Sequence, residues 1–252
     1  MHLLLGTRKG LLIFEQQGSS FQLVRKAFDG IPVVYACKDP NTGDLWASLE
    51  HGHWGGKLGR SSDFGANWDA IEAPQYPEGA TYRAFSGEDK PASYEFTWNI
   101  APGAKDEVGT LYFGTNPGGL FVTRNNGETF EWMESLWNEP GRSAWFGGGK
   151  DTPGFSNVVV DPDNGDNIYA AVSCGGVYHS DDHGKSFQRR NKGLKADFLP
   201  DPEADVGHDP HCISVCATDR KVIWQQNHCG IFRSEDGGLN WQDLSQKDQG
   251  AY

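Results

Sequence analysis

Short apolar runs, each closed by a polar turn, recur along the whole chain. Residues 33–37, 96–100, 157–160 and 211–215 are apolar or alternate with polar residues. After a polar turn, a second run follows each of them, such as residues 111–113 or 168–170. Apolar runs this short, bounded by turn residues, are typical of β-strands. The pattern therefore predicts an all-β chain built from repeated units of short strands.

An eight-residue motif, Ser/Thr-x-Asp/Asn-x-Gly-x-x-Trp/Phe, follows the third strand expected in each unit. Its copies occupy residues 61–68, 123–130, 180–187 and 234–241. The Asp or Asn side chain can accept hydrogen bonds from backbone N–H groups just downstream, and Gly supplies the positive φ that a tight turn requires. We therefore predict the same hairpin turn in every unit. A decayed copy has Gln16, Gly18 and Phe21 at the matching positions.

The repeated unit predicts a β-propeller, because four antiparallel strands per repeat make one propeller blade. The motif resembles the Asp-box (BNR) repeat of sialidases and sortilin-type receptors. The chain as a whole resembles a bacterial group described as exo-α-sialidase-like or glycosyl hydrolase-like. The segments that carry this resemblance are 51–55, 145–149, 173–177, 207–212 and 226–230. The resemblance implies the fold, whereas unrelated functions share such repeats.

The number of units predicts an incomplete ring. Residues 3–5 align with 111–113, a second strand, so the first blade lacks its innermost strand. We expect residues 1–252 to form a single Asp-box propeller domain, C-terminally truncated, with about five blade units of a six- or seven-bladed propeller. Residues 249–252 are too few to supply the missing strand.

Composition narrows the function classes. A net charge of −12 without a basic run argues against nucleic-acid binding. No apolar stretch approaches the roughly 18 residues that a membrane span needs. Residues 1–5 lack the basic region and cleavage site of a signal peptide, and five cysteines without framework spacing suit a reducing compartment. We therefore expect a soluble, cytoplasmic protein.

Strand alternation sorts the loops of such a blade onto two faces. The second-to-third loops and the blade-to-blade connections share one, the loop face; the first-to-second turns and the Asp-box turns share the other, the turn face. The long connections 69–95, 131–155 and 188–210 belong to the loop face. Because long loops on a rigid scaffold commonly carry function, we predict the site there.

Histidines suggest a metal on the loop face. His51, His53, His211 and His228 fall on its segments, and together they could hold a divalent transition metal such as zinc. Alternatively, these imidazoles hydrogen-bond the loop backbone. No tightly spaced ligand motif decides between the two.

Sialidase chemistry is a second hypothesis. It needs an arginine cluster, a Tyr–Glu nucleophile pair and an acid/base Asp. Asp29 stands where the resemblance places the first of these arginines. The candidate catalytic residues on the loop face are Tyr94, Glu95, Asp151 and Asp209.

The candidate ligand-binding residues are aromatic or polar loop residues, with loop packing as the alternative reading of each. They are Trp54, Asn116, Arg142, Trp145 and Asn227. The first interpretation is a propeller that binds a small polar, carbohydrate-like molecule, with hydrolysis and a metal left open. The alternatives are a sialidase-like glycoside hydrolase and a non-enzymatic scaffold whose loop face docks a protein partner.

Overall fold

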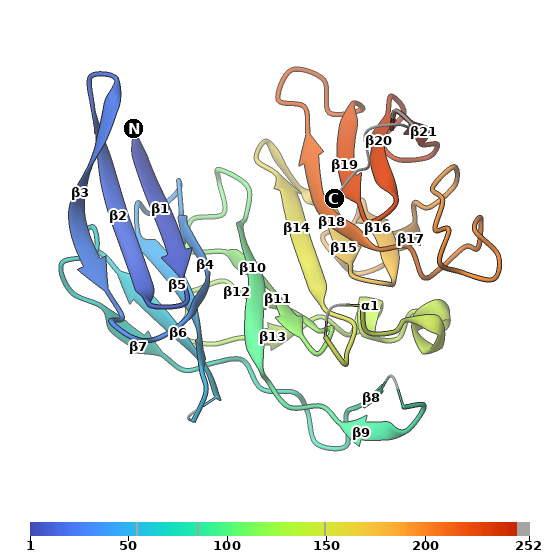
Figure 1. Ribbon diagram of the computed structural model, residues 1–252, viewed down its shortest axis with the longest axis horizontal. Helices are drawn as coiled ribbons and strands as arrows, with labels where there is room; N and C mark the ends of the chain where they lie inside the picture. Colours follow the sequence, from blue (N-terminus) through green and yellow to red (C-terminus); the bar gives the residue numbers. More distant parts are fainter. Residues whose placement is uncertain (54, 85, 149, 246–252) are drawn as a thin grey trace.

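Five antiparallel sheets are arranged in an arc (Figure 1). The fold is that of a computed structural model, which describes residues 1–53, 55–84, 86–148 and 150–245. The first sheet contains β1 (His2–Thr7), β2 (Gly10–Gln17) and β3 (Ser20–Ala27). The second contains β4 (Val33–Lys38), β5 (Leu45–His51), β6 (Gly55–Ser61) and β7 (Asp69–Ile71).

The other three blades also have four strands each, in sequential order. The third contains β10 (Phe96–Pro102), β11 (Leu111–Asn116), β12 (Leu120–Thr123) and β13 (Glu131–Trp132). The fourth contains β14 (Phe155–Asp161), β15 (Asn164–Val172), β16 (Gly176–Ser180) and β17 (Gln188–Arg189). The fifth contains β18 (Pro210–Val215), β19 (Ile223–Asn227), β20 (Gly230–Ser234) and β21 (Gln242–Asp243).

The remaining elements lie in the long connections. The hairpin of β8 (Thr81–Arg83) and β9 (Asp89–Pro91) precedes the third blade, and α1 (Glu134–Trp137) and the 3₁₀ helix η1 (Pro140–Ala144) follow it. No helix of the described residues is long and apolar enough to cross a membrane.

The first strands of neighbouring blades pack side by side, β4 against β10, β10 against β14 and β14 against β18. The Asn99 Oδ1 accepts a hydrogen bond from the Val158 N–H at 2.9 Å, and the Asn157 Oδ1 accepts one from the Ile213 N–H at 3.0 Å. Asparagine side chains thus join consecutive inner strands. The prediction of an all-β, incomplete propeller of four-stranded blades is confirmed.

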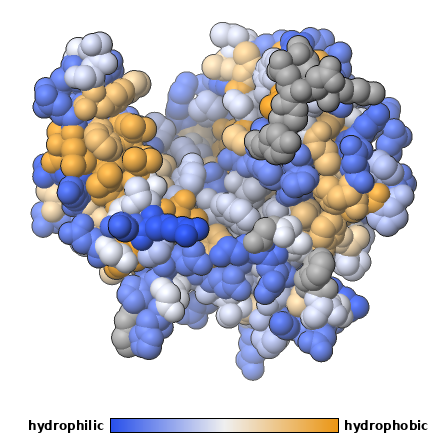
Figure 2. All heavy atoms as spheres, viewed as in Figure 1, coloured by the Kyte–Doolittle hydropathy of each residue, from blue (hydrophilic) through white to orange (hydrophobic). Residues whose placement is uncertain are grey.

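The first blade has three strands, and within the described residues β1 pairs only with β2. Leu3 and Leu5 on this strand are 45% and 43% exposed. Figure 2 shows an open notch between the first blade and the rest of the molecule, and apolar residues gather on that blade. Residues 249–252, to which the expectation about ring closure refers, lie outside the described residues.

All four repeated turns share one hydrogen-bond pattern. The Oδ1 atom of Asp63, Asn125, Asp182 or Asp236 accepts a bond from the N–H four residues on, at 2.8–3.0 Å. The Ser or Thr two positions earlier accepts a bond from the N–H of the motif glycine at 2.7–2.9 Å. The motif therefore supplies the partners for its own turn backbone, as predicted.

The turns also bind the blades together. A Cβ added to Gly127, in the turn of the third blade, would lie 2.5 Å from Cη2 of Trp46, which is fully buried in the second blade. Trp46 packs edge-on against Phe113 at a centroid distance of 5.5 Å. The apolar core is thus located between consecutive blades.

Candidate functional site

A pocket of about 500 Å³ opens on the loop face, which points downward in Figure 1. Its wall comes from four loop-face segments: the connection after η1, the β15–β16 loop, the connection before β18 and the β19–β20 loop. The lining residues are Phe146, Gly147, Gly148, Cys174, Phe198, Asp209, His211 and His228. We refer to it as the loop-face pocket. Its volume lies within the ordinary range of small-molecule sites.

Asp209 supplies a buried carboxylate to this pocket, with an exposed fraction of 7%. Its Oδ1 accepts hydrogen bonds from the Ser173 Oγ at 2.8 Å and the Cys174 N–H at 3.2 Å. Burial by itself would raise the pKa of Asp209, but hydrogen bonds from His211 and Ser173 outweigh it and lower the pKa. The pocket therefore presents a fixed negative charge at neutral pH.

His211 reaches Asp209 because β18 is irregular at that point. Pro210 pairs with Asn227 and Cys212 pairs with Gln226, which leaves His211 as the extra residue of a β-bulge. A bulge redirects a side chain, and here the Nε2 of His211 lies 3.2 Å from the Asp209 Oδ2. This hydrogen bond raises the pKa of His211 against the opposing effect of partial burial.

His228 approaches the same carboxylate from the β19–β20 loop. Its backbone N–H donates to the Asp209 carbonyl oxygen at 2.9 Å, and its Nδ1 lies 3.9 Å from the Asp209 Oδ2. Its ring packs edge-on against Phe198 at a centroid distance of 5.5 Å. Two of the four histidines expected to bind a metal are thus brought together.

The other two, His51 and His53, lie at the β5–β6 loop of the second blade. They are on the same face by strand direction, but among the described residues the group of ligand atoms contains only Asp209, His211 and His228. Trp54, a candidate for ligand binding, lies outside the described residues.

A second polar group surrounds Asn116. Its Nδ2 donates to the Glu95 Oε2 at 2.5 Å, and its Oδ1 accepts from the Thr152 Oγ at 2.9 Å. Asn116 is fully buried. Because Glu95, Asn116 and Thr152 belong to three different loop-face segments, these two hydrogen bonds join the segments together. Tyr94 lies beside this group, and burial raises its pKa to about 12, whereas Asp151 is exposed. Tyr94, Glu95 and Asp151 are not among the residues that line the loop-face pocket.

 The catalytic roles expected of Tyr94, Glu95 and Asp151 stay predictions.

Arg142 lines a neighbouring pocket of about 490 Å³ between the β8–β9 hairpin and η1, together with Arg83. The guanidinium carbon of Arg142 stacks 3.4 Å from the centroid of a Trp137 ring, and burial lowers the pKa of Arg142 to about 10. Arg83 forms an ion pair with Asp89 at 3.4 Å. Both guanidinium groups thus already have partners within the protein.

The remaining ligand candidates pack inside the fold. Trp145 is 2% exposed, and its indole N–H donates to the Tyr178 hydroxyl at 2.7 Å. Asn227 is fully buried, where its Nδ2 donates to the Gln225 Oε1 at 2.9 Å and its Oδ1 accepts from the Cys229 N–H at 3.2 Å. Their side chains support the loops that form the pocket.

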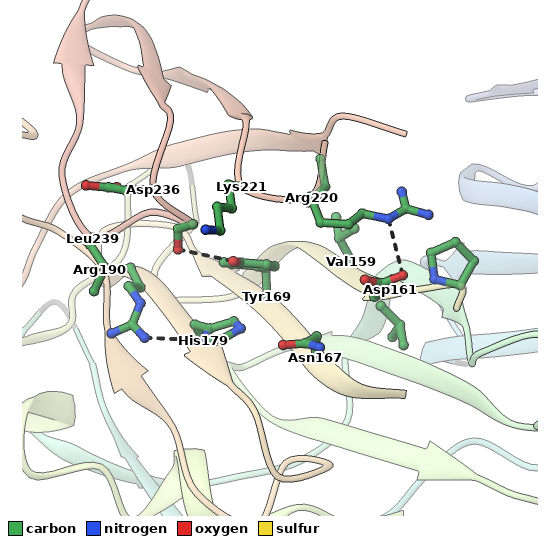
Figure 3. A pocket seen from close by; sticks show the side chains of 14 residues that line it. Val159, Asp161, Asn167, Tyr169, His179, Arg190, Arg220, Lys221, Asp236 and Leu239 are labelled. Carbon is green, nitrogen blue, oxygen red and sulfur yellow. Dashed lines mark hydrogen bonds and ion pairs between the residues drawn. The ribbon is translucent and has the colours of Figure 1, made fainter. Parts of the chain in front are cut away.

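A cavity of about 470 Å³ lies between the fourth and fifth blades (Figure 3). Arg220 forms an ion pair with Asp161 at 3.3 Å, and a guanidinium nitrogen of Arg190 lies 3.3 Å from the His179 Nδ1. Burial is the main cause that lowers the pKa of His179 to about 4, so this ring is neutral. The buried carboxylate of Asp209 beside an exposed aromatic ring distinguishes the loop-face pocket from this cavity.

Sequence reasoning missed Phe198, which is 43% exposed at the rim of the loop-face pocket. The available signal was a lone aromatic residue within the polar connection 188–210. It also missed the hydrogen bond from Ser173 that fixes Asp209, because residues 36 positions apart give no local pattern.

Comparisons with known proteins agree with the propeller fold. No protein-family model matches the chain. Over 91 residues, 36% of this chain, it is 30% identical to a probable oligoxyloglucan-reducing end-specific xyloglucanase from Neosartorya fischeri, of which it covers 11%. The GH74 xyloglucanase from Xanthomonas campestris superposes with a TM-score of 0.58 at 16% identity, over 96% of this chain and 36% of that one.

YCF48 from Cyanidioschyzon merolae superposes with a TM-score of 0.52 at 17% identity, over 92% of this chain and 60% of that one. At these identities the two structural likenesses show the β-propeller fold alone. The chain spans less than two thirds of the length of each of these three proteins.

Proposed function

We propose that the chain is a carbohydrate-binding propeller of the Asp-box type, and that a neutral oligosaccharide occupies the loop-face pocket. The observation that carries this proposal is the pairing of an exposed aromatic ring, Phe198, with the buried carboxylate of Asp209 in one pocket. A sugar ring has an apolar face that packs on an aromatic side chain and hydroxyl groups that donate to a carboxylate. The sequence similarity to the probable xyloglucanase from Neosartorya fischeri supports the same ligand class.

The charge of the pocket favours a neutral sugar over a sialic acid. Asp209 is ionised, and the described lining residues include no arginine or lysine. His211, the basic group in contact with Asp209, is already hydrogen-bonded to that carboxylate. An anionic sugar would therefore meet a like charge without a guanidinium to bind its carboxylate. This argues against the sialidase-like alternative.

The pocket supports binding more directly than hydrolysis. Glycosidases of the usual kinds use two carboxyl groups on either side of the scissile bond. Asp209 is the one carboxylate among the described lining residues. A hydrolytic role would require a second carboxylate, so binding is the function we propose.

Isothermal titration with neutral xyloglucan oligosaccharides and with a sialyl-oligosaccharide tests the proposal. We expect binding of the neutral sugars, and Phe198→Ala to weaken it about tenfold because the ring contact is lost. Phe21→Ala is the matched control, since this ring is 39% exposed on β3 in the first blade. Unchanged binding by Phe198→Ala, or binding of the sialylated sugar alone, would contradict the proposal.

A further inference from the structure

Three metal-ligating side chains converge at the loop-face pocket. One ligand atom from each of Asp209, His211 and His228 lies within 4.8 Å of the other two. The carboxylate is buried, whereas the two imidazoles are 43% and 62% exposed and adjoin the pocket. The carboxylate of Asp209 is therefore held in place within the protein, whereas the two imidazoles leave the group open to the pocket.

The separations fit one metal ion. Bonds of about 2.1 Å at a tetrahedral angle place neighbouring ligand atoms about 3.4 Å apart. The Asp209 Oδ2 lies 3.2 Å from the His211 Nε2 and 3.9 Å from the His228 Nδ1. The ligand atoms of the two imidazoles lie within 4.8 Å of each other, and rotation of these exposed rings would bring them to the same spacing.

An internal hydrogen bond accounts for only part of the arrangement. The contact between His211 and Asp209 is a hydrogen bond in its own right. The 3.9 Å separation between the His228 Nδ1 and the carboxylate is too long for one. The hydrogen bond between His211 and Asp209 therefore does not explain why the His228 Nδ1 faces the same carboxylate. A metal ion bound by all three side chains would explain it.

Neighbouring residues form hydrogen bonds that orient two of the three ligands. Ser173 and the Cys174 N–H hold Oδ1 of Asp209, which leaves Oδ2 directed at the imidazoles. The Nδ1 of His211 lies 3.1 Å from Nε2 of Gln226, and this amide can turn so that its oxygen accepts a hydrogen bond from that nitrogen. Such partners orient metal ligands and fix the tautomer of a histidine.

We propose that Asp209, His211 and His228 form a binding site for a divalent transition metal, zinc in the first instance. Two imidazoles and one carboxylate are ligands that zinc prefers, and three protein ligands leave a coordination position open to the pocket. The ion would replace the proton that His211 shares with Asp209, so affinity rises with pH. This proposal goes beyond sugar binding and does not depend on it.

The test is zinc titration of chelator-treated protein prepared without a His tag, in the absence of sugar. We expect one zinc ion per chain for the wild type and loss of that ion in Asp209→Asn and His228→Ala. Asparagine retains an Oδ1 that accepts the bonds from Ser173 and Cys174, so Asp209→Asn keeps the local structure. Circular dichroism verifies the fold of each variant.

Two further variants sharpen the result. Ser173→Ala removes a positioning residue and should weaken zinc binding about 10- to 100-fold. The double variant His51→Ala/His53→Ala removes imidazoles outside the group and should retain one zinc ion. Wild-type protein that binds no zinc, Asp209→Asn that binds it normally, or loss of zinc in the double variant would overturn the proposal.

Discussion

Two glycines at the same place in the repeated turn allow the packing between blades to be measured. Gly127 and Gly238 have φ angles of +89° and +82°. A Cβ added to Gly127 would lie 2.5 Å from the Trp46 Cη2 and 3.3 Å from the Ile71 Cγ2. At Gly238 the nearest atoms would be 3.5 Å away, an ordinary van der Waals distance. Alanine thus meets the same backbone strain at both sites but a steric clash at only one.

The expected losses differ by the cost of that clash. Positive φ costs an L-residue about 1–2 kcal/mol, which applies to both Gly127→Ala and Gly238→Ala. Trp46 is fully buried and cannot move without disturbing the second blade, so overpacking adds about 1–3 kcal/mol at Gly127. We therefore expect the free energy of unfolding to fall by about 1–2 kcal/mol for Gly238→Ala and about 2–5 kcal/mol for Gly127→Ala.

Urea denaturation followed by tryptophan fluorescence measures both losses, provided that the m-value is unchanged. The comparison is internal, because the two substitutions add the same methyl group to the same turn. Equal losses at the two positions, or a larger loss for Gly238→Ala, would refute the claim that the turns lock consecutive blades together.

Three further outcomes follow from the contacts described. Asp182→Ala should lower the free energy of unfolding by about 1 kcal/mol and leave sugar binding unchanged, because the turn lies on the opposite face; paired denaturation and titration measure this. Hydrogen bonds from the residue four positions on hold the pKa of Asp63 and of Asp182 at about 2. Their contribution to stability is complete above the unfolded pKa of about 4 and is lost as the pH falls toward 2, so melting temperatures should drop across that window, less steeply in Asp182→Asn. Trp145→Phe removes the donor to the Tyr178 hydroxyl and should cost about 1–3 kcal/mol in urea denaturation; an unchanged midpoint would contradict the buried hydrogen bond.

The architecture was predictable because each blade repeats the same local signals. The turn motif carries its own hydrogen-bond acceptors and glycine, so a stretch of eight residues specifies the turn without help from distant parts of the chain. Aligning four copies then gave the strand order and the missing inner strand of the first blade. Repetition converted a weak pattern into a specific one.

The site was predictable only in part, because distant contacts decide it. His211 and His228 were candidates from their loop positions, but the bulge in β18 that turns His211 toward Asp209 has no sequence signal of its own. Trp145 was expected to contact a ligand, whereas the structure buries it.

The most direct test of the account is a crystal structure of the protein grown with a neutral xyloglucan oligosaccharide. The account predicts a sugar ring against Phe198, with a hydroxyl group directed at Asp209. A sugar bound instead in the cavity between the fourth and fifth blades, or beside the β8–β9 hairpin, would contradict it.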